Sequence, residues 1–377
     1  MKGKALLKYE TILLELRQRI ANGEFSEQGK LPTEGELATQ YNCSRPTIRK
    51  ALDELEDSGF LITRKGSGTY LSQEIIESPL SVEINGEKGS RNLLLGLLFQ
   101  DFGPSYIFDT ICNQLTKIAA ETGYSMVYGG YVSSDSADFS TQVNLFVQRL
   151  INLKVDGVFF APFEYCVDRD ALNHQVLQQF EKAHIAVVLI DTDVDDFPKR
   201  SNIDLVSLDH IQSGYIITNH LILQGAKRII FIAPPNSAHT IKLRTIGFNA
   251  SLIDNDIIPL KRNYVELNPD NHLEVKKCID ELMPEAIVCS NDTCASNLVD
   301  SLLKIGYKVP DDILVAGFDN SSAISKLRVP LTSIMQPLAG IAREAVRTMF
   351  RRIENPHSDY TTIRLQGTLV IRKSSAR

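Results

Sequence analysis

From residue 92 onward, short apolar runs alternate with longer amphipathic stretches. The apolar runs include LLLGLLF, YSMVYGG, VDGVFFAP, IAVVLID, RIIFIAP, AIVCSN and ILVAGFD, and the stretches between them include FSTQVNLFVQRLINLK, YIITNHLILQG and SNLVDSLLKIG. Continuous apolar strands separated by helices are typical of parallel sheets that helices cover on both faces. Because residues 92–377 are too many for one comfortable core, we expect two α/β lobes.

The first 72 residues follow another pattern, which predicts three short helices and a hairpin. Tyr9, Ile12, Leu13, Leu16 and Ile20 mark one face of the first helix. Thr33 and Glu36 stand in capping-box register, so a second helix should begin at Thr33. Ser44 is a suitable N-cap for a third helix over residues 45–58, and strand-forming residues then flank a glycine-rich tip. This order of elements is a winged helix-turn-helix.

The segment between these two patterns, residues 73–91, loses periodicity and contains Pro79, Gly86 and Gly89. We interpret it as a linker. The chain is therefore predicted to be a multidomain protein, with a winged helix-turn-helix domain in residues 1–72 and a two-lobed α/β domain with parallel sheets in residues 92–377.

The chain has a net charge of −6, which argues against a wholly basic nucleic-acid binder. Residues 1–72 are nevertheless slightly basic, with 11 Lys and Arg against 10 Asp and Glu. Arg45 and Arg49 lie four residues apart and share the exposed face of the third helix. A helix fits the major groove, where arginine can donate twice to guanine. We predict a DNA-binding face made of Ser44, Arg45, Thr47, Arg49, Lys65 and Gly66.

The sequence LPTEGELATQYNCSRPTIRKALDELEDSGFLITRKGSGTYL resembles the DNA-binding domain of GntR-type regulators over about residues 6–72. The resemblance implies that Arg45, Thr47 and Arg49 read or clamp the operator, with Gly66 at the wing. Many members have a basic residue where this chain has Gly35, so the operator sequence cannot be copied from relatives.

Polar residues follow several predicted strand ends in the larger region, where open α/β sheets bind ligands. They include Tyr106, Glu164, Asp191, Asn291, Asp292 and Asp319, and Arg244 stands in a helix after FIAPP. Carboxylates, an amide and an arginine suit a neutral polyhydroxyl ligand, because each hydroxyl can donate to a carboxylate and accept from arginine. For any single aspartate, capping of the next helix is an equal alternative.

This region also resembles the effector domain of the lactose-repressor (LacI/GalR) family, which is similar to periplasmic sugar-binding proteins, over roughly residues 92–372. Its clearest marks are VVLIDTD, GYIITNHLILQGAKRIIFIA, KLRTIGFNASL, AIVCSNDTCASNLVDSLLKIGYKVPDDILVAGFDN and PLTSIMQP. The resemblance places Arg244, Asn291 and Asp319 in an effector site, with Tyr106, Asp191, Thr240 and Gln336 as further members; Glu164 is a candidate from its position alone. The GntR-type domain replaces that family's own DNA-binding domain, a combination that resembles the arabinose-repressor subgroup.

Other classes of protein fit less well. The six cysteines form no CxxC pair, so we expect no disulfide, metal site or cofactor. The chain has no GxSxG, HExxH, Walker or GxGxxG motif, which disfavours an enzyme. A solute-binding protein of the transport type would explain the lobes but not the N-terminal domain, and no signal peptide or membrane span is recognisable. We expect a cytoplasmic protein.

The resulting hypothesis is a homodimeric transcription regulator on a pseudo-palindromic operator, acting as the repressor of a sugar-utilisation operon. A monosaccharide such as L-arabinose, or a 6-deoxyhexose such as L-fucose, would release it. The chain has no tryptophan, the usual stacking platform for sugars, which keeps a nucleobase or a sugar phosphate as alternative effectors. Activation in place of repression also stays open.

Overall fold

The computed structural model describes residues 30–57, 61–64, 68–71, 93–100, 106–128, 138–164, 168–235 and 237–376, together with Ile12, Leu16, Phe25 and Cys166. Internal contacts divide the chain into two compact units, Met1–Arg91 and Asn92–Arg377, and each is described by itself. The predicted linker over residues 73–91 lies outside the described residues. So does the predicted first helix, apart from Ile12 and Leu16, which are helical and buried.

The N-terminal unit contains the predicted second and third helices followed by a hairpin. They are α2 (Glu34–Gln40), α3 (Arg45–Asp57), β1 (Leu61–Arg64) and β2 (Gly68–Leu71). Thr33 caps α2 through a complete capping box with Glu36, as predicted. Strands β1 and β2 pair antiparallel. The apolar face of α3 packs inward, where Ile48 and Leu55 are fully buried.

The larger unit consists of two lobes, each built on a six-stranded sheet. The sheet of lobe 1 has the order β13-β7-β6-β5-β3-β4 and is parallel throughout. Its strands are β3 (Leu94–Leu98), β4 (Ser125–Tyr128), β5 (Gly157–Phe160), β6 (Ala186–Ile190), β7 (Asp204–Leu208) and β13 (Thr362–Leu365).

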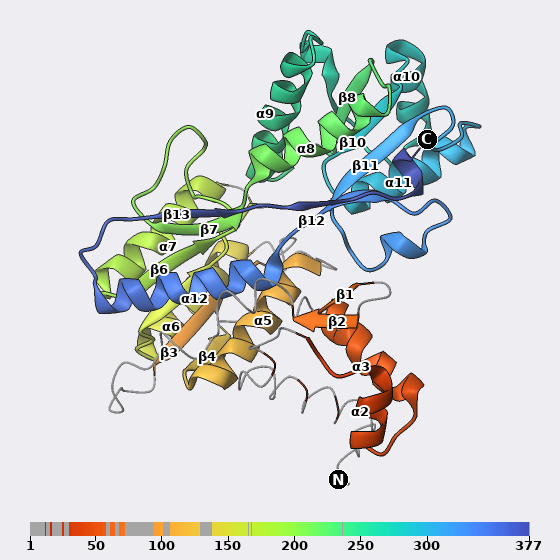
Figure 1. Cartoon of the computed structure of the whole chain (residues 1–377). Helices are drawn as coiled ribbons and strands as arrows, with labels where there is room; N and C mark the ends of the chain where they lie inside the picture. The colour runs from red at the N-terminus through yellow and green to blue at the C-terminus, as the bar shows by residue number, and fades with distance from the viewer. Residues whose placement is uncertain are drawn as a thin grey trace. The chain divides into compact units, whose positions relative to one another are not determined.

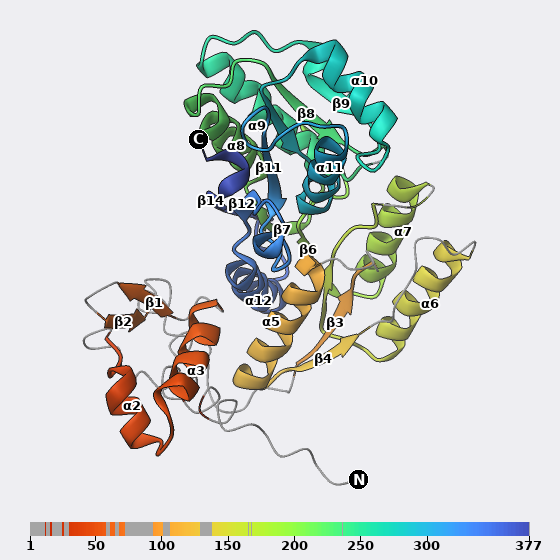
Figure 2. The ribbon, with the colours of Figure 1, turned by 90° about the vertical axis from the view of Figure 1, so that its right-hand side faces the viewer.

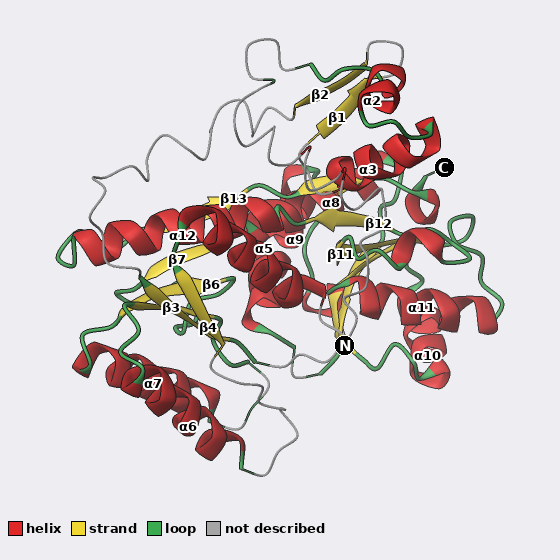
Figure 3. Ribbon diagram, turned by 90° about the horizontal axis from the view of Figure 1, so that it is seen from below, coloured by secondary structure: helices red, strands yellow, loops and turns green. Residues whose placement is uncertain are grey.

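Helices cover both faces of the lobe 1 sheet, because its strands are apolar on both faces. Helices α5 (Tyr106–Thr122) and α12 (Leu338–Glu354) lie side by side on one face, and α6 (Phe139–Asn152) and α7 (Arg169–Lys182) cover the other (Figure 3).

Lobe 2 repeats this plan with the sheet order β14-β12-β11-β10-β8-β9. Its strands are β8 (Ile229–Ala233), β9 (Tyr264–Glu266), β10 (Ala286–Cys289), β11 (Leu314–Asp319), β12 (Thr332–Met335) and β14 (Thr368–Val370), of which β14 alone pairs antiparallel. Helices α8 (His210–Leu223) and α9 (His239–Asp254) pack on one face, and α10 (His272–Leu282) and α11 (Asp292–Lys304) pack on the other (Figure 2).

The chain passes between the lobes three times: from β7 to α8, from β12 to α12, and from β13 to β14. The last passage is the long ribbon from β13 into lobe 2 in Figure 1. Strands of both sheets therefore end near the same hinge. This topology brings residues from distant parts of the sequence to one cleft between the lobes.

The backbones of helices α8 and α9 are in contact, because each helix has a glycine on the side that faces the other helix. A Cβ atom on Gly214 of α8 would overlap the carbonyl oxygen of Arg244, and one on Gly247 of α9 would overlap that of Ile211. This close packing fixes the position of α9 on lobe 2, and with it the position of Arg244.

The predicted fold class is confirmed, including the two lobes and their parallel sheets. All seven predicted apolar runs form strands. Strands β7, β9, β12, β13 and β14 were not among the predictions. No helix in the described ranges is long and apolar enough to cross a membrane.

Candidate functional site

The predicted DNA-binding residues of the third helix lie together at its start. Arg45 and Arg49 are exposed, as is Ser44, whose hydroxyl lies 2.8 Å from that of Thr47. Lys65 and Gly66, predicted at the wing tip, lie outside the described residues.

The two arginines of this face differ in their contacts. Arg49 donates from Nε and Nη2 to the two carboxylate oxygens of Glu34, at 2.9 and 2.7 Å. This hydrogen-bonded pair lowers the pKa of the Glu34 carboxyl. Arg45 lies beside Gly35: a Cβ atom on Gly35 would come within 3.1 Å of the Nη2 atom of Arg45. Within the described part of the chain Arg45 makes no hydrogen bond, so its guanidinium is available to a base or a phosphate.

A chain of five polar side chains connects the two lobes, and two of its members, Asp191 and His210, line a pocket. The Asp191 carboxylate, at the end of β6 in lobe 1, lies 3.1 Å from Nε2 of His210. Arg244 of α9 donates from Nε to His210 Nδ1 at 3.3 Å, and its Nη2 lies 3.6 Å from the Asp319 carboxylate. Gln336 donates to that same carboxylate at 2.9 Å. The chain thus links the ends of β6, β11 and β12 across both lobes.

His210 has a defined role in this chain of contacts. A guanidinium has no acceptor, so His210 Nδ1 must accept from Arg244, and the Nε2–H therefore donates a hydrogen bond to the Asp191 carboxylate. His210 is buried and is the first residue of α8, directly after the N-cap Asp209. It was not among the predicted site residues, because its position after a strand end is equally typical of an ordinary helix start.

Two of the carboxylates sit on strained backbone. Asp191 has a φ of 72° and Asp319 a φ of 105°, a region that residues other than glycine rarely adopt. Strain of this kind concentrates at functional sites, where the surrounding structure maintains it. The Phe318 ring also positions Arg244, since the guanidinium carbon lies over the ring at 4.5 Å from its centroid.

Burial and neighbouring charges shift the pKa values of the carboxyl groups at this site. Burial, reinforced by Asp191, raises the pKa of Glu164 to about 8. Burial also raises the pKa of Asp319, although Arg244 offsets part of this shift. The pKa of Asp191 lies below its ordinary value despite burial, because His210 and Arg244 stabilise its charge. Among these three carboxyl groups, the surroundings therefore favour the charged form of Asp191 alone.

The other predicted effector residues lie outside this chain of contacts. The Asn291 side chain caps α11 by accepting from the Cys294 amide at 2.8 Å, which is the alternative role weighed for residues at strand ends. Thr240 is buried on α9, one turn before Arg244. Tyr106 begins α5, but its side chain lies outside the described residues.

Gln100 and Asp292 also contribute buried polar groups here. Gln100 accepts from the Glu164 amide at 3.1 Å, and it was not predicted as a site residue. Asp292 accepts from the Ser333 hydroxyl at 2.6 Å and from the Ser321 amide at 2.8 Å, behind the Asp319 loop. The described residues contain no cluster of His, Cys, Asp or Glu suited to a metal ion.

Two protein families match separate parts of the chain. Residues 8–71 match the family of bacterial regulatory proteins named gntR, and residues 218–375 match the periplasmic binding protein-like domain. With the helix-turn-helix and the two-lobed cleft, these matches define the class: a DNA-binding transcription regulator that joins a GntR-type domain to a periplasmic-binding-protein-like domain.

The relatives are also regulators and not enzymes. The arabinose metabolism transcriptional repressor of Geobacillus stearothermophilus is 26% identical over 100% of this chain and 99% of its own length. An HTH-type transcriptional repressor named PurR, from Mannheimia succiniciproducens, is 29% identical over 60% of this chain and 66% of its own length. The lac repressor dimer bound to operator and an anti-inducer shares the fold, with a TM-score of 0.63 and 20% identity over 77% of this chain and 96% of that one.

Proposed function

We propose that this protein is a homodimeric repressor that binds a pseudo-palindromic operator and releases it when a neutral monosaccharide enters the cleft. The observation that supports this most directly is the chain of contacts from Asp191 through His210, Arg244 and Asp319 to Gln336. These side chains alternate acceptors and donors across both lobes. A polyol could replace several of these contacts at once and bridge the lobes.

The charge of the cleft favours a neutral ligand over an anionic one. Asp319 lies 3.6 Å from the buried Arg244, whose charge also acts on the carboxyl group of Asp191. A phosphate group would bring further negative charge beside these carboxyl groups, at a cost that low dielectric increases. Sugar phosphates are therefore the weaker candidates.

L-Arabinose is the first candidate effector, because a relative that aligns with the whole chain is named an arabinose metabolism repressor. L-Fucose, a 6-deoxyhexose, offers similar hydroxyl chemistry. A purine base is the second candidate, since several relatives of the larger region are named PurR.

On the DNA side, we propose that residues 1–72 bind the operator through Ser44, Arg45, Thr47 and Arg49, with Lys65 and Gly66 at the wing. Residues 73–91 would connect this domain to an effector-binding and dimerisation domain over residues 92–377. Because the two sites belong to separate units, the effector would act by shifting a conformational equilibrium and not by competing with DNA.

A thermal-shift screen with L-arabinose, L-fucose, arabinose 5-phosphate and hypoxanthine tests the effector. A ligand that binds only the folded state raises the melting temperature, by an amount that grows with its concentration over Kd. The Asp319→Ala variant is the control and should lose the shift. No response to either neutral sugar would contradict the proposal, and a response to hypoxanthine alone would favour the purine alternative.

Calorimetric titration of the active sugar with and without operator DNA then tests the coupling. A coupling of about 1–3 kcal/mol is typical, and DNA must weaken sugar binding by the same factor as the sugar weakens DNA binding. Equal sugar affinity in both titrations would mean that the sites are independent. Tighter binding with DNA would indicate a co-repressor or an activator.

A further inference from the structure

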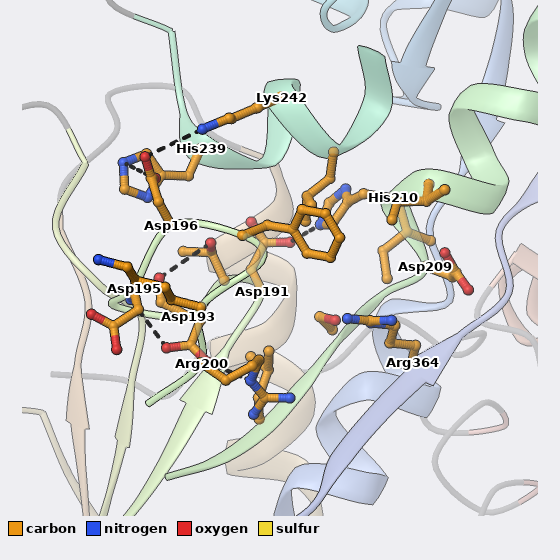
Figure 4. Close-up of a pocket in the computed structure, with 18 residues that line it drawn as sticks. Asp191, Asp193, Asp195, Asp196, Arg200, Asp209, His210, His239, Lys242 and Arg364 are labelled. Carbon is orange, nitrogen blue, oxygen red and sulfur yellow. Dashed lines mark hydrogen bonds and ion pairs between the residues drawn. The ribbon is translucent and has the colours of Figure 1, made fainter. Parts of the chain in front are cut away.

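A loop of lobe 1 grips the first turn of α9 in lobe 2. The loop follows β6, and its residue Asp196 makes two contacts with α9: Oδ1 lies 3.1 Å from His239 Nε2, and Oδ2 lies 3.4 Å from Lys242 Nζ. Figure 4 shows the Asp196 carboxylate directed toward these two side chains, at one side of a pocket that the same loop encloses.

A second carboxyl group of lobe 1 holds the same residue of α9. The backbone N–H of His239 donates to Glu164 Oε1 at 3.1 Å. Glu164 follows β5 and Asp196 follows β6, so two neighbouring strand ends of lobe 1 converge on one helical residue of lobe 2. We name this arrangement of Glu164, Asp196, His239 and Lys242 the clasp.

The loop that presents Asp196 is braced inside lobe 1. Asp193 accepts from Arg200 Nε at 2.7 Å and from the Ser201 amide at 3.1 Å, which closes the base of the loop. Asp195 lies 3.1 Å from Nε2 of His174 on α7, also in lobe 1. Because the loop is fixed at these points, the contacts of Asp196 bear on the position of α9 relative to lobe 1 and not on the shape of the loop itself.

On α9 itself, the clasp residue Lys242 and the candidate effector residues Thr240 and Arg244 lie on different faces. Thr240 and Arg244, four residues apart, are buried toward the cleft, whereas Lys242 is exposed. Asp196 is itself half exposed and makes no contact with Arg244 or Asp319 among the described residues. Asp196 lies at the pocket that Asp191 and His210 also line, and it acts on Arg244 and Asp319 through α9.

We propose that Asp196 is a positioning residue that holds the two lobes closed over the cleft, through His239 and Lys242. Its link to effector binding rests on the function proposed above. The clasp needs no ligand, so it would set how often the unliganded protein adopts the closed form. The apparent affinity of an effector that binds the closed form depends on that population.

Hydrogen exchange on the full-length protein, without any ligand, tests the clasp directly. In an Asp196→Ala variant, we expect amide exchange across residues 239–243 to rise about two- to fivefold, the range for loss of a partly exposed ion pair. The matched control is Asp195→Ala, which removes a carboxylate from the same loop but breaks only a contact within lobe 1. It should leave exchange in residues 239–243 unchanged.

The second measurement is L-arabinose affinity by calorimetry. Asp196→Ala should weaken binding by up to the same factor, and Asp195→Ala should not. Unchanged exchange in Asp196→Ala would overturn the clasp whatever the effector is, and so would equal increases in both variants. Increased exchange with fully unchanged arabinose affinity would overturn the link to effector binding. If exchange rises as expected but the wild type binds no arabinose, the proposed effector is wrong and the clasp stands.

Discussion

Closure of the lobes around Glu164 should consume a proton. The Glu164 carboxyl lies against the α9 backbone of lobe 2, and burial there, with Asp191 as the next cause, raises its pKa from the ordinary 4.5 to about 8. The hydrogen bond from the His239 backbone N–H, together with Arg169 and Arg244, opposes this shift but does not cancel it. When the lobes open, water reaches the carboxyl and its pKa should return toward 4.5. The protonated form therefore favours the closed lobes.

The size of the effect follows from these two pKa values. Moving a carboxyl from 4.5 to about 8 corresponds to about 5 kcal/mol between its ionised and protonated forms. At pH 7 the closed form would hold about 0.9 proton on Glu164 and the open form almost none. Because the pKa is raised in the closed form, closure is favoured at low pH and weakens as pH rises through about 8. Effector affinity should fall about 50-fold between pH 6 and pH 8.

Calorimetry in buffers of different ionisation enthalpy measures this proton uptake. For a wild type that is mainly open before it binds, L-arabinose binding at pH 7 should take up close to one proton. The Glu164→Gln variant can still accept from the His239 amide but cannot titrate, so its uptake should vanish and its affinity should depend little on pH. Binding without proton uptake in the wild type, or the same uptake in both proteins, would refute the assignment of the shift to Glu164.

Three further outcomes are expected. Arg244→Ala should abolish the response to effector while operator binding persists, as gel-shift titrations with and without sugar would show; normal release would remove Arg244 from the site. Arg45→Ala should weaken operator binding by about 1–3 kcal/mol if Arg45 contacts a base. Arg49→Ala should weaken operator binding less, if Glu34 keeps Arg49 from the bases. Equal losses of operator affinity in the two variants would contradict this difference. Gly247→Ala should lower the free energy of unfolding by about 1–3 kcal/mol in urea denaturation, since α8 leaves no room for a methyl group. An unchanged midpoint would refute the close packing of the two helices.

Much of the fold was predictable because its signals are local. The alternation of apolar strands with helices identified the parallel sheets, and the capping box at Thr33 located α2. The unpredicted strands lack that local signal. β9 is three residues long and exposed at the sheet edge, and β13 and β14 depend on pairing with strands far away in the sequence. Their formation is a tertiary effect.

For the candidate site, the sequence selects residues by their position but does not show their contacts. Position after a strand end selected Asp191 and Asp319, which the fold does bring to one cleft with Arg244. The same rule selected Asn291, whose side chain caps α11 by accepting from the Cys294 amide. It could not find His210, because only the folded geometry shows that its two ring nitrogens face Asp191 and Arg244. In the DNA-binding domain, a shared helix face made Arg45 and Arg49 look equivalent, although Glu34 pairs with Arg49.

Helix α9 connects these observations mechanically. One face holds Thr240 and Arg244 in the cleft, another holds Lys242 at the clasp, and Gly247 packs against the α8 backbone with no intervening side chain. A helix fixed this closely to its own lobe cannot adjust one face independently of the others, because packed interiors transmit displacement. A ligand that draws Arg244 toward Asp191 must therefore move lobe 2 as a body, and the contacts at the clasp must tighten or break with it.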